Sequence, residues 1–375
     1  LRDELSRLGH GFRTSSDTEV ALAALMEWGE EAFRRFDGMY SIAWYDRQMA
    51  KLVVCRDKLG IKPLFVYRQD DFLAFASEIK PLIASPRIPR QINENAVAEV
   101  VAFQFIMPPD TLFKGIESLR PGHYVSVDIG KGTTQETCYW QIDGSMIEDP
   151  HAPSVEEALV TSLRSAWDAD RNVGVQLSGG VDSSLAVALS HDVLGRHEQN
   201  TFSVVFDDSQ ARYYLPRSEE KFIQTVTDQF GIQNQSFLFS AEEVGPALAE
   251  AIWFHEAPLH GPSTCLYMLL AGKIHDQVTV LITGEGADDI FLGYFADWSF
   301  DSDPRSLFKY FVQPDNLKAL FGSEGEDRAI AKRLNLAADN RLSGMSPLQK
   351  GSILTIEAVL HGLLARHDRM FMSQS

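Results

Sequence analysis

The chain has 375 residues, of which 45% are apolar and 23% charged, and this length suits about two or three domains with a sizeable core. The composition excludes a disordered, collagen-like or coiled-coil chain. The formal net charge of −18 argues against nucleic acid and membranes as partners, because phosphates and anionic lipids repel an acidic surface.

The first part of the chain predicts one helix followed by short antiparallel strands. The stretch Ser16-Asp17-Thr18-Glu19 is a capping-box pattern, in which Ser16 accepts from the third amide of the helix and Glu19 returns to the first. Polar turns separate apolar runs at residues 39–45, 51–56, 63–67 and 72–76, which we interpret as strands. This half is predicted to be a layered α+β domain.

The polar, proline-containing stretch 142–154 predicts a linker, and the pattern changes after it. Helices are expected at residues 156–167, 183–194, 218–230 and 266–275, and strands at 173–177, 201–206 and 278–283. This alternation predicts a parallel sheet with helices on both faces, which binds ligands at the carboxyl ends of its strands. Residues 300–351 predict mostly helix.

The cysteine pattern and the absence of targeting signals point to a reducing compartment. Cys55, Cys138 and Cys265 show no CxxC spacing, so we expect neither a disulfide framework nor a structural zinc site. The sequence starts without a signal-peptide pattern and contains no apolar run of about 18 residues. We therefore expect a soluble, cytoplasmic protein.

A glycine-rich loop follows the strand at 173–177 and opens the next helix: Ser178-Gly179-Gly180-Val181-Asp182-Ser183-Ser184. The glycines permit a tight turn, the first helical amides are unpaired donors, and the serine hydroxyls add further donors, which together suit a phosphate. The loop is neither a GxxxxGK[ST] nor a GxGxxG pattern. The alternative is a plain turn in which Asp182 or Ser183 caps the helix.

A second loop follows the strand at 278–283 and reads Gly284-Glu285-Gly286-Ala287-Asp288-Asp289. Its clustered carboxylates repel one another unless they are solvated, protonated or bound to a cation. A magnesium-bound nucleotide pyrophosphate meets that need, whereas the alternative is a solvated acidic turn. Two such loops on one sheet favour the nucleotide.

Together the two loops resemble a known family. Residues 177–184 are similar to the SGGxDS loop of ATP pyrophosphatases, and residues 283–289 resemble the SGEGxDE loop of asparagine synthetases. The stretches 15–19, 37–41, 56–64 and 76–80 are similar to the class II glutaminase domain of that family. Asp368-Arg369-Met370, with Met372 and Ser375, resembles its late DRMxMxxS stretch.

The resemblance implies an α/β plus α+β protein. An Ntn-type glutaminase sandwich, incomplete at its start, would span residues 1–148, and a parallel-sheet ATP-pyrophosphatase domain (adenine nucleotide α-hydrolase-like), truncated at its C-terminus, would span 149–375. The implied reaction is ATP-dependent amide formation: a carboxylate displaces pyrophosphate to form an acyl-adenylate, and ammonia from glutamine displaces AMP. ATP and Mg²⁺ are the implied cofactors. Glutamine or ammonia and a carboxylic-acid small molecule are the implied partners, and a homodimer is left open.

The resemblance also implies site residues. Glu285 and Asp288 would be catalytic, Asp182 and Asp288 would bind Mg²⁺, and Asp17 would hold the α-amino group of glutamine. The residues implied to bind ATP and pyrophosphate are Leu177, Ser178, Gly179, Gly180, Val181, Asp182, Ser183, Ser184, Val204, Thr283, Gly284, Glu285 and Gly286.

The sequence also departs from the family pattern. Residue 1 is Leu where a class II glutaminase has its nucleophilic Cys, so we expect a trimmed chain that does not hydrolyse glutamine, the alternative being degenerate half-sites. The departures at Thr283, Asp289, Leu292 and Phe371 suggest a specialised acid substrate. Two other functions stay open: an intramolecular amide cyclase like the β-lactam synthetases, with a non-functional glutaminase domain, and a catalytically inactive scaffold.

Overall fold

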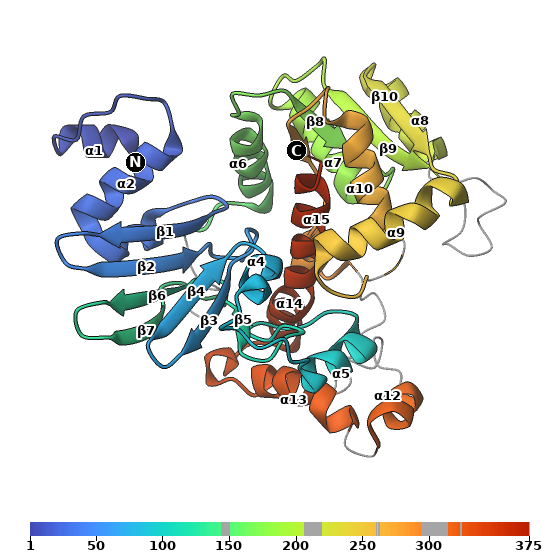
Figure 1. Ribbon diagram of the computed structural model, residues 1–375. Coiled ribbons are helices and arrows are strands. Elements are labelled where there is room, and N and C mark those ends of the chain that lie inside the picture. Colours follow the sequence, from blue (N-terminus) through green and yellow to red (C-terminus); the bar gives the residue numbers. More distant parts are fainter. Residues whose placement is uncertain are drawn as a thin grey trace. The chain divides into compact units, whose positions relative to one another are not determined.

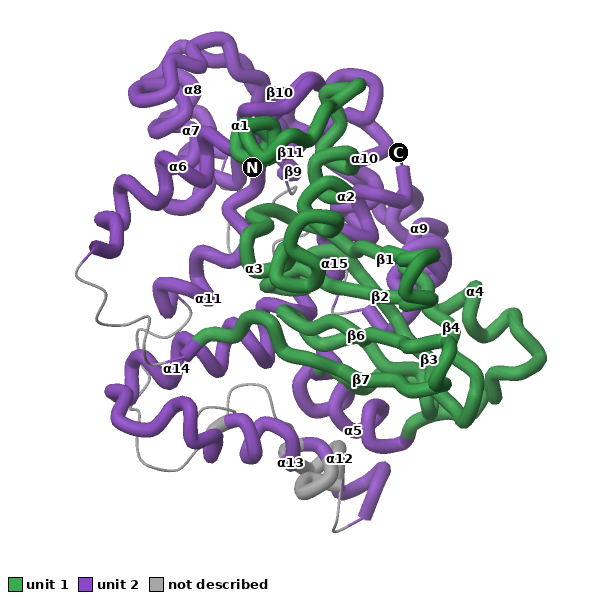
Figure 2. Tube along the Cα trace, turned by 90° about the vertical axis from the view of Figure 1, so that its left-hand side faces the viewer, with its two compact units in different colours: residues 1–93, 108–142 green, residues 94–107, 143–375 purple. Residues whose placement is uncertain are grey.

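The computed structural model describes residues 1–143, 151–205, 220–259, 261, 263–293, 314–322 and 325–374. The chain divides into two compact units, shown in different colours in Figure 2. Unit 1 comprises residues 1–93 and 108–142, and unit 2 comprises residues 94–107 and 143–375.

Unit 1 contains two antiparallel sheets, as predicted from the polar turns between short strands. One sheet has the strand order β1-β2-β6-β7 and the other the order β4-β3-β5. The strands are β1 (Ser41–Asp46), β2 (Lys51–Arg56), β3 (Phe65–Gln69), β4 (Phe72–Ala76), β5 (Ile116–Ser118), β6 (His123–Asp128) and β7 (Thr133–Cys138). The helices are α1 (Arg2–Arg7), α2 (Asp17–Trp28), the 3₁₀ turn η1 (Gly29–Glu31), α3 (Ala32–Arg35) and α4 (Ile79–Ala84).

Helix α2 begins where the sequence predicts, but its cap differs from the predicted capping box. The Ser16 hydroxyl accepts from the Thr18 amide at 3.2 Å, the second amide of the helix instead of the third. The Glu19 carboxylate reaches past Ser16 and accepts from the amides of Arg13 and Thr14 at 2.9 and 2.8 Å. Glu19 therefore ties down the turn before the helix.

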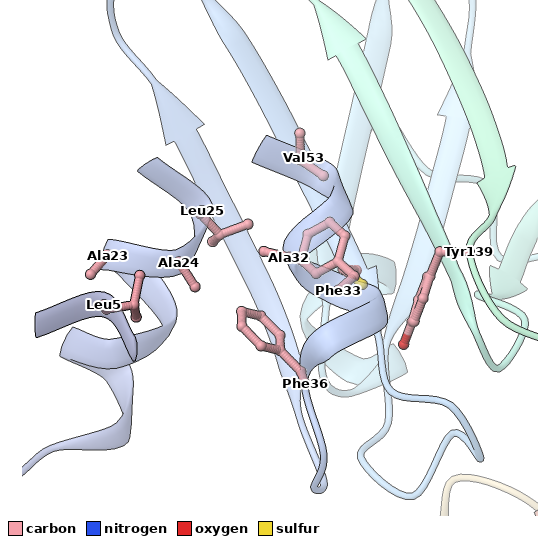
Figure 3. Close-up of a cluster of buried hydrophobic side chains, with 10 residues drawn as sticks. Leu5, Ala23, Ala24, Leu25, Ala32, Phe33, Phe36, Val53 and Tyr139 are labelled. Atoms are coloured by element: carbon pink, nitrogen blue, oxygen red, sulfur yellow. The ribbon is translucent and has the colours of Figure 1, made fainter. Parts of the chain in front are cut away.

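The core of unit 1 lies between these helices and the β1-β2-β6-β7 sheet (Figure 3). Phe33 of α3 is fully buried, and its ring centre lies 5.5 Å from that of Tyr124 and 5.7 Å from that of Tyr139. The Tyr139 hydroxyl donates to the Arg56 carbonyl at 2.8 Å, so the polar end of this buried ring is satisfied. These contacts fix α2 and α3 on the sheet.

Unit 2 is built on a parallel sheet with the strand order β10-β9-β8-β11, as predicted from the alternation of strands and helices. Its strands are β8 (Val173–Gln176), β9 (Asn200–Val205), β10 (Gln233–Leu238) and β11 (Val280–Ile282). Four of its helices are α6 (Val155–Trp167), α7 (Val181–Asp192), α8 (Glu220–Phe230) and α10 (Ser263–Ile274). The remaining helices, many of them in the C-terminal third, are α5 (Glu94–Phe103), α9 (Ala241–His255), α11 (Ala287–Phe291), α12 (Pro314–Phe321), α13 (Gly325–Ala337), the 3₁₀ turn η6 (Asn340–Leu342), α14 (Pro347–Thr355), the π-helical turn η7 (Ile356–Leu360) and α15 (His361–Met372).

Two separate apolar clusters place helices on both faces of this sheet. On one face Val175 and Ile282 join a cluster with Val187 of α7 and Ile223 of α8. On the other face Phe202 packs with residues of α10 and with Phe371 of α15. Figure 1 labels these two helices. Strands buried on both faces are typical of parallel sheets.

The strand order places a topological switch point between β8 and β11. From β8 the chain runs outward through β9 to β10, and it returns to the other side of β8 as β11. In such sheets the loops after the two strands at the switch point leave a crevice at the carboxyl ends of the strands. The two glycine-rich loops predicted to bind the nucleotide are the ones that follow β8 and β11.

Among the described residues, no helix combines the length and the apolarity that crossing a membrane requires. Of the stretch 300–351 predicted to be mostly helical, residues 300–313, 323 and 324 lie outside the described residues, and the rest is mostly helical.

Candidate active site

The loop after β8 turns tightly and leads straight into α7. Gly179 has a φ of +85°, a backbone conformation that favours glycine. The hydroxyls of Ser178 and Ser183 lie 3.0 Å apart, and the Ser178 amide donates to the Ser183 hydroxyl at 3.1 Å. These two hydroxyls, which the sequence predicts to face a phosphate, therefore form hydrogen bonds within the loop itself. No side chain caps α7, so the amides of its first turn stay available to an anion.

The loop after β11 packs directly against this first loop. A Cβ built on Gly284 would lie 3.0 Å from the Cβ of Asp182 and 3.1 Å from the Ser183 amide nitrogen, so only glycine fits without a shift. Gly286 has a φ of +93° and leads into α11. The structure thus brings together the two loops singled out in the sequence.

Both loops line one pocket of about 160 Å³. Typical small-molecule pockets hold roughly 300 to 1,000 Å³, so a ligand of nucleotide size would extend beyond this one. The residues that line it are Gln176, Ser178, Gly180, Asp182, Ser183, Tyr267, Thr283, Gly284, Glu285, Gly286, Asp288 and His367. Five residues expected to bind ATP lie outside this lining, namely Leu177, Gly179, Val181, Ser184 and Val204.

The pocket is strongly acidic. Burial raises the pKa of Asp288, and the charge of Asp182 raises it further. Burial also raises the pKa of Glu285, with Arg366 opposing this effect and Asp288 adding to it. A cation between the carboxylates would relieve this repulsion.

Asp182 and Asp288 suit Mg²⁺ as oxygen ligands. In the part of the chain that the structure describes, no three His, Cys, Asp or Glu side chains are grouped to hold a metal by themselves. Mg²⁺ at nucleotide sites is usually held by one or two carboxylates, with phosphate oxygens and water completing its shell. The two carboxylates in this pocket match that arrangement.

Two residues of α15 that the sequence analysis missed contact Glu285. A guanidinium nitrogen of Arg366 lies 3.4 Å from Glu285 Oε1, and His367 Nε2 lies 3.3 Å from Glu285 Oε2. Arg366 and His367 directly precede the Asp368-Arg369-Met370 stretch. The resemblance of that stretch to the family marked this segment of the chain, but it did not identify these two side chains. Tyr267 of α10 adds an aromatic wall, with its ring centre 4.1 Å from that of His367.

Asp289 is buried behind the pocket. Its side chain is inaccessible to solvent, and neither carboxylate oxygen has a hydrogen-bond partner. Burial, followed by the charges of Glu285 and Asp288, raises the pKa of Asp289 to about 7. Asp289 therefore holds a proton over much of the acidic range.

Leu292 ends α11 with a φ of +59°. That conformation favours glycine. Leu292, one of the departures from the family pattern, thus holds a backbone conformation that is strained for a residue with a side chain.

Unit 1 contains a larger pocket of about 840 Å³ beside the start of α2. Asp17, the first residue of α2, lines it together with Arg2, Tyr40 and Lys62. A carboxylate and two cations near one another suit an amino acid, whose amino and carboxylate groups they would pair with. Cys55 does not line this pocket; it is fully buried, and burial raises the pKa of its thiol, so it is no ready nucleophile.

Comparisons with known proteins match each part of the chain to a family. A family model described as "Glutamine amidotransferase domain" matches residues 1–140, and one described as "Asparagine synthase" matches residues 154–375. "Asparagine synthetase [glutamine-hydrolyzing] 3" of Bacillus subtilis is 27% identical over 100% of this chain and 64% of its own length. "Asparagine synthetase [glutamine-hydrolyzing] 1" of the same organism is 31% identical over 85% of this chain and 49% of its own length.

A putative asparagine synthetase [glutamine-hydrolyzing] of Mycobacterium tuberculosis is 29% identical over 96% of this chain and 54% of its own length. The chain thus spans 49% to 64% of the length of these relatives. Among solved structures, the glutamine phosphoribosylpyrophosphate amidotransferase of B. subtilis, complexed with ADP and GMP, covers 64% of this chain and 68% of its own, with 13% identity and a TM-score of 0.27.

Proposed function

The chain belongs to the asparagine synthase family, and on this premise we propose that it forms an amide from a carboxylic acid, ATP and glutamine-derived ammonia. The observation that carries the proposal is the direct contact between the loops after β8 and β11, seen at Gly284 and Asp182. This contact joins an uncapped helix N-terminus to a carboxylate cluster at the switch point of a parallel sheet. The helix N-terminus suits the negative charge of a nucleotide pyrophosphate, and the carboxylates suit the metal ion bound to it.

We assign the first step to the α7 side of the pocket. The amides at the start of α7 bind the phosphates, and Asp182 and Asp288 would hold Mg²⁺. Bound Mg²⁺ neutralises the charge that develops on the departing pyrophosphate. What the protein itself contributes is positioning: the rigid contact between the loops fixes the substrate carboxylate relative to the α-phosphorus.

We assign the second step to Glu285. Its carboxylate lines the pocket, and burial raises its pKa towards the range of a general base that works near neutral pH. Glu285 takes the proton that the amine loses as it attacks the acyl-adenylate. General-base catalysis of this kind is worth about 10²- to 10⁴-fold in rate.

We assign glutamine to the pocket of unit 1, where Asp17 would pair with the α-amino group. The acid substrate is proposed to be specialised. Thr283, which departs from the family pattern, lines the pocket of unit 2, and Phe371, which also departs, packs against its aromatic wall. We expect the reaction to take place in the cytoplasm.

The proposal is tested by identifying the products of ATP. The purified protein is incubated with Mg²⁺, ammonia, a panel of carboxylic acids and ATP labelled at either the α- or the γ-phosphate. AMP and pyrophosphate should form only when a suitable acid is present. ADP as the product of ATP would overturn the proposal. Amide formation without added ammonia would indicate that the acid substrate supplies its own amine, as in a cyclase.

A further inference from the structure

Helix α15 presents two consecutive side chains to the two oxygens of one carboxylate. Arg366 lies 3.4 Å from Glu285 Oε1 and His367 lies 3.3 Å from Glu285 Oε2. The two α15 side chains are only 7% and 10% exposed, and that of Glu285 is 17% exposed. Solvent therefore screens these interactions weakly.

The hydrogen bond on the far side of the imidazole decides which nitrogen carries the hydrogen. His367 Nδ1 lies 3.3 Å from the Leu363 carbonyl oxygen, which can only accept, so Nδ1 donates. The ring lies against Tyr267 and stacks on Phe371. Burial, together with the charge of Arg366, lowers the pKa of His367 to about 3, so the ring is neutral. A neutral ring with its hydrogen on Nδ1 turns the lone pair of Nε2 towards Glu285.

A lone pair at this place opposes an ionised carboxylate and stabilises a protonated one, because only the protonated oxygen can donate to it. Arg366 has the opposite effect and favours the ionised form. Asp288 and Asp289 of α11 and Tyr267 of α10 also interact electrostatically with Glu285. Among the described residues, only Arg366 and His367 form an ion pair or hydrogen bond with its carboxylate oxygens. Arg366 thus favours the ionised form of Glu285, which is the base, and His367 favours its protonated form.

We propose, on the basis of the proposed function, that His367 is a positioning residue that readies Glu285 to receive the proton of the attacking amine. As the N–C bond forms, the C–O bond to AMP breaks and AMP leaves with the bonding electrons. The amine proton moves to Glu285 Oε2, whose new O–H points to His367 Nε2. His367 thus stabilises the protonated Glu285 that this step produces, and the step needs no further reactant.

The test separates the two half-reactions. His367→Leu keeps the bulk of the side chain and removes the acceptor, His367→Gln restores an acceptor near the place of Nε2, and Phe371→Leu disturbs the ring stack without touching Glu285. Each variant is assayed with the acid from the panel, L-aspartate included, that gives the parent its fastest pyrophosphate exchange. The two rates measured are exchange of pyrophosphate into ATP and amide formation from ammonia across the pH range.

His367→Leu should keep pyrophosphate exchange within about 3-fold of the parent and lose amide formation by about 10-fold, less than the roughly 10²-fold or more expected for loss of the base itself. The acidic limb of its pH profile should move to lower pH, because Arg366 would act on Glu285 unopposed. His367→Gln should recover most of the activity. An equal loss in both half-reactions, matched by Phe371→Leu, would overturn the proposal, as would an unchanged pH profile.

Infrared spectroscopy gives a readout that does not need activity. The band of the protonated Glu285 carboxyl, identified as the band lost in Glu285→Gln, is titrated in the parent and in His367→Leu. The midpoint should fall to lower pH in His367→Leu, and an unchanged midpoint would refute the pairing. If the parent shows no pyrophosphate exchange with any acid, the proposed function fails, and this titration still decides the role of His367.

Discussion

Gly284 and Asp182 lie in direct contact: a Cβ placed on Gly284 would be 3.0 Å from the Cβ of Asp182. The same Cβ would meet the Ser183 amide nitrogen at 3.1 Å. The strand ends fix both loops, so Gly284→Ala must force them apart. Overpacking of this kind costs about 1 to 3 kcal/mol. We expect ATP affinity, measured by calorimetry in the presence of Mg²⁺, to fall by roughly 10-fold or more.

Gly245→Ala provides the matched control for this prediction. A Cβ on Gly245, inside α9, would meet nothing within 4 Å. Alanine there should leave ATP affinity unchanged, because the added methyl group would meet no atom of either loop. Unchanged ATP affinity in Gly284→Ala would show that the loop contact does not shape the nucleotide site.

Asp182→Asn should abolish pyrophosphate release while leaving the fold intact. The change removes one of the two carboxylates proposed to hold Mg²⁺, and the hydrogen bonds that close the loop come from Ser178 and Ser183 instead. Pyrophosphate release is measured over a range of Mg²⁺ concentrations, with circular dichroism as the check on folding. Asp192→Asn, at the exposed end of the same helix, is the control and should behave like the parent. Normal turnover by Asp182→Asn would remove Asp182 from the metal site.

The sequence predicts the two loops well because their signals are local. A glycine pair before a helix and a carboxylate cluster after a strand act through neighbouring residues, and the alternation of elements places both at one sheet edge. Arg366 and His367 escaped prediction because they contact Glu285 from more than 80 residues along the chain, and only the packing of α15 brings them there. Even the local capping box was wrong in detail, because the turn before α2 brings the amides of Arg13 and Thr14 to Glu19 and the pattern of four residues does not include them.

Glu285→Gln should separate activation of the acid from formation of the amide. The amide keeps the size of the side chain and can still pack beside Arg366, but it cannot take up a proton. Pyrophosphate exchange should continue, whereas amide formation from ammonia should fall by about 100-fold or more, as for loss of a general base. Both rates are measured on the same preparation. Normal amide formation would assign Glu285 a purely structural role.

Removing one member of the buried ion pair between α5 and α13 should destabilise unit 2. Glu99 and Arg333 are each 1% exposed and lie 3.3 Å apart, with Lys332 also 3.3 Å from Glu99. Arg333→Met leaves the Glu99 charge buried with one cation fewer, which should cost about 3 to 5 kcal/mol in unfolding free energy.

The double variant Glu99→Met/Arg333→Met should recover part of that loss, because it removes both fully buried charges and apolar replacements of buried pairs are often neutral. Lys332, which loses Glu99 as its partner, is 28% exposed and still donates to the Met107 carbonyl. Denaturant unfolding of the parent, both single variants and the double variant measures the coupling. Additive effects of the two changes would show that the pair does not act as a unit.

Asp17→Ala should weaken glutamine binding in the pocket of unit 1. Asp17 is exposed at the first residue of α2 and lines that pocket. Its Oδ1 accepts from the Thr18 hydroxyl at 3.4 Å, and the carboxylate has further lone pairs to accept from an α-amino group. Loss of one charge-assisted hydrogen bond is worth about 1.5 to 3 kcal/mol, or roughly 10- to 150-fold in affinity. Calorimetric titration with glutamine measures the change, and Glu31→Gln, which removes an exposed carboxylate outside the pocket lining, is the control. Glutamine bound equally well by the parent and Asp17→Ala would place the amino group elsewhere in unit 1, and no binding by the parent would contradict the assignment of this pocket to glutamine.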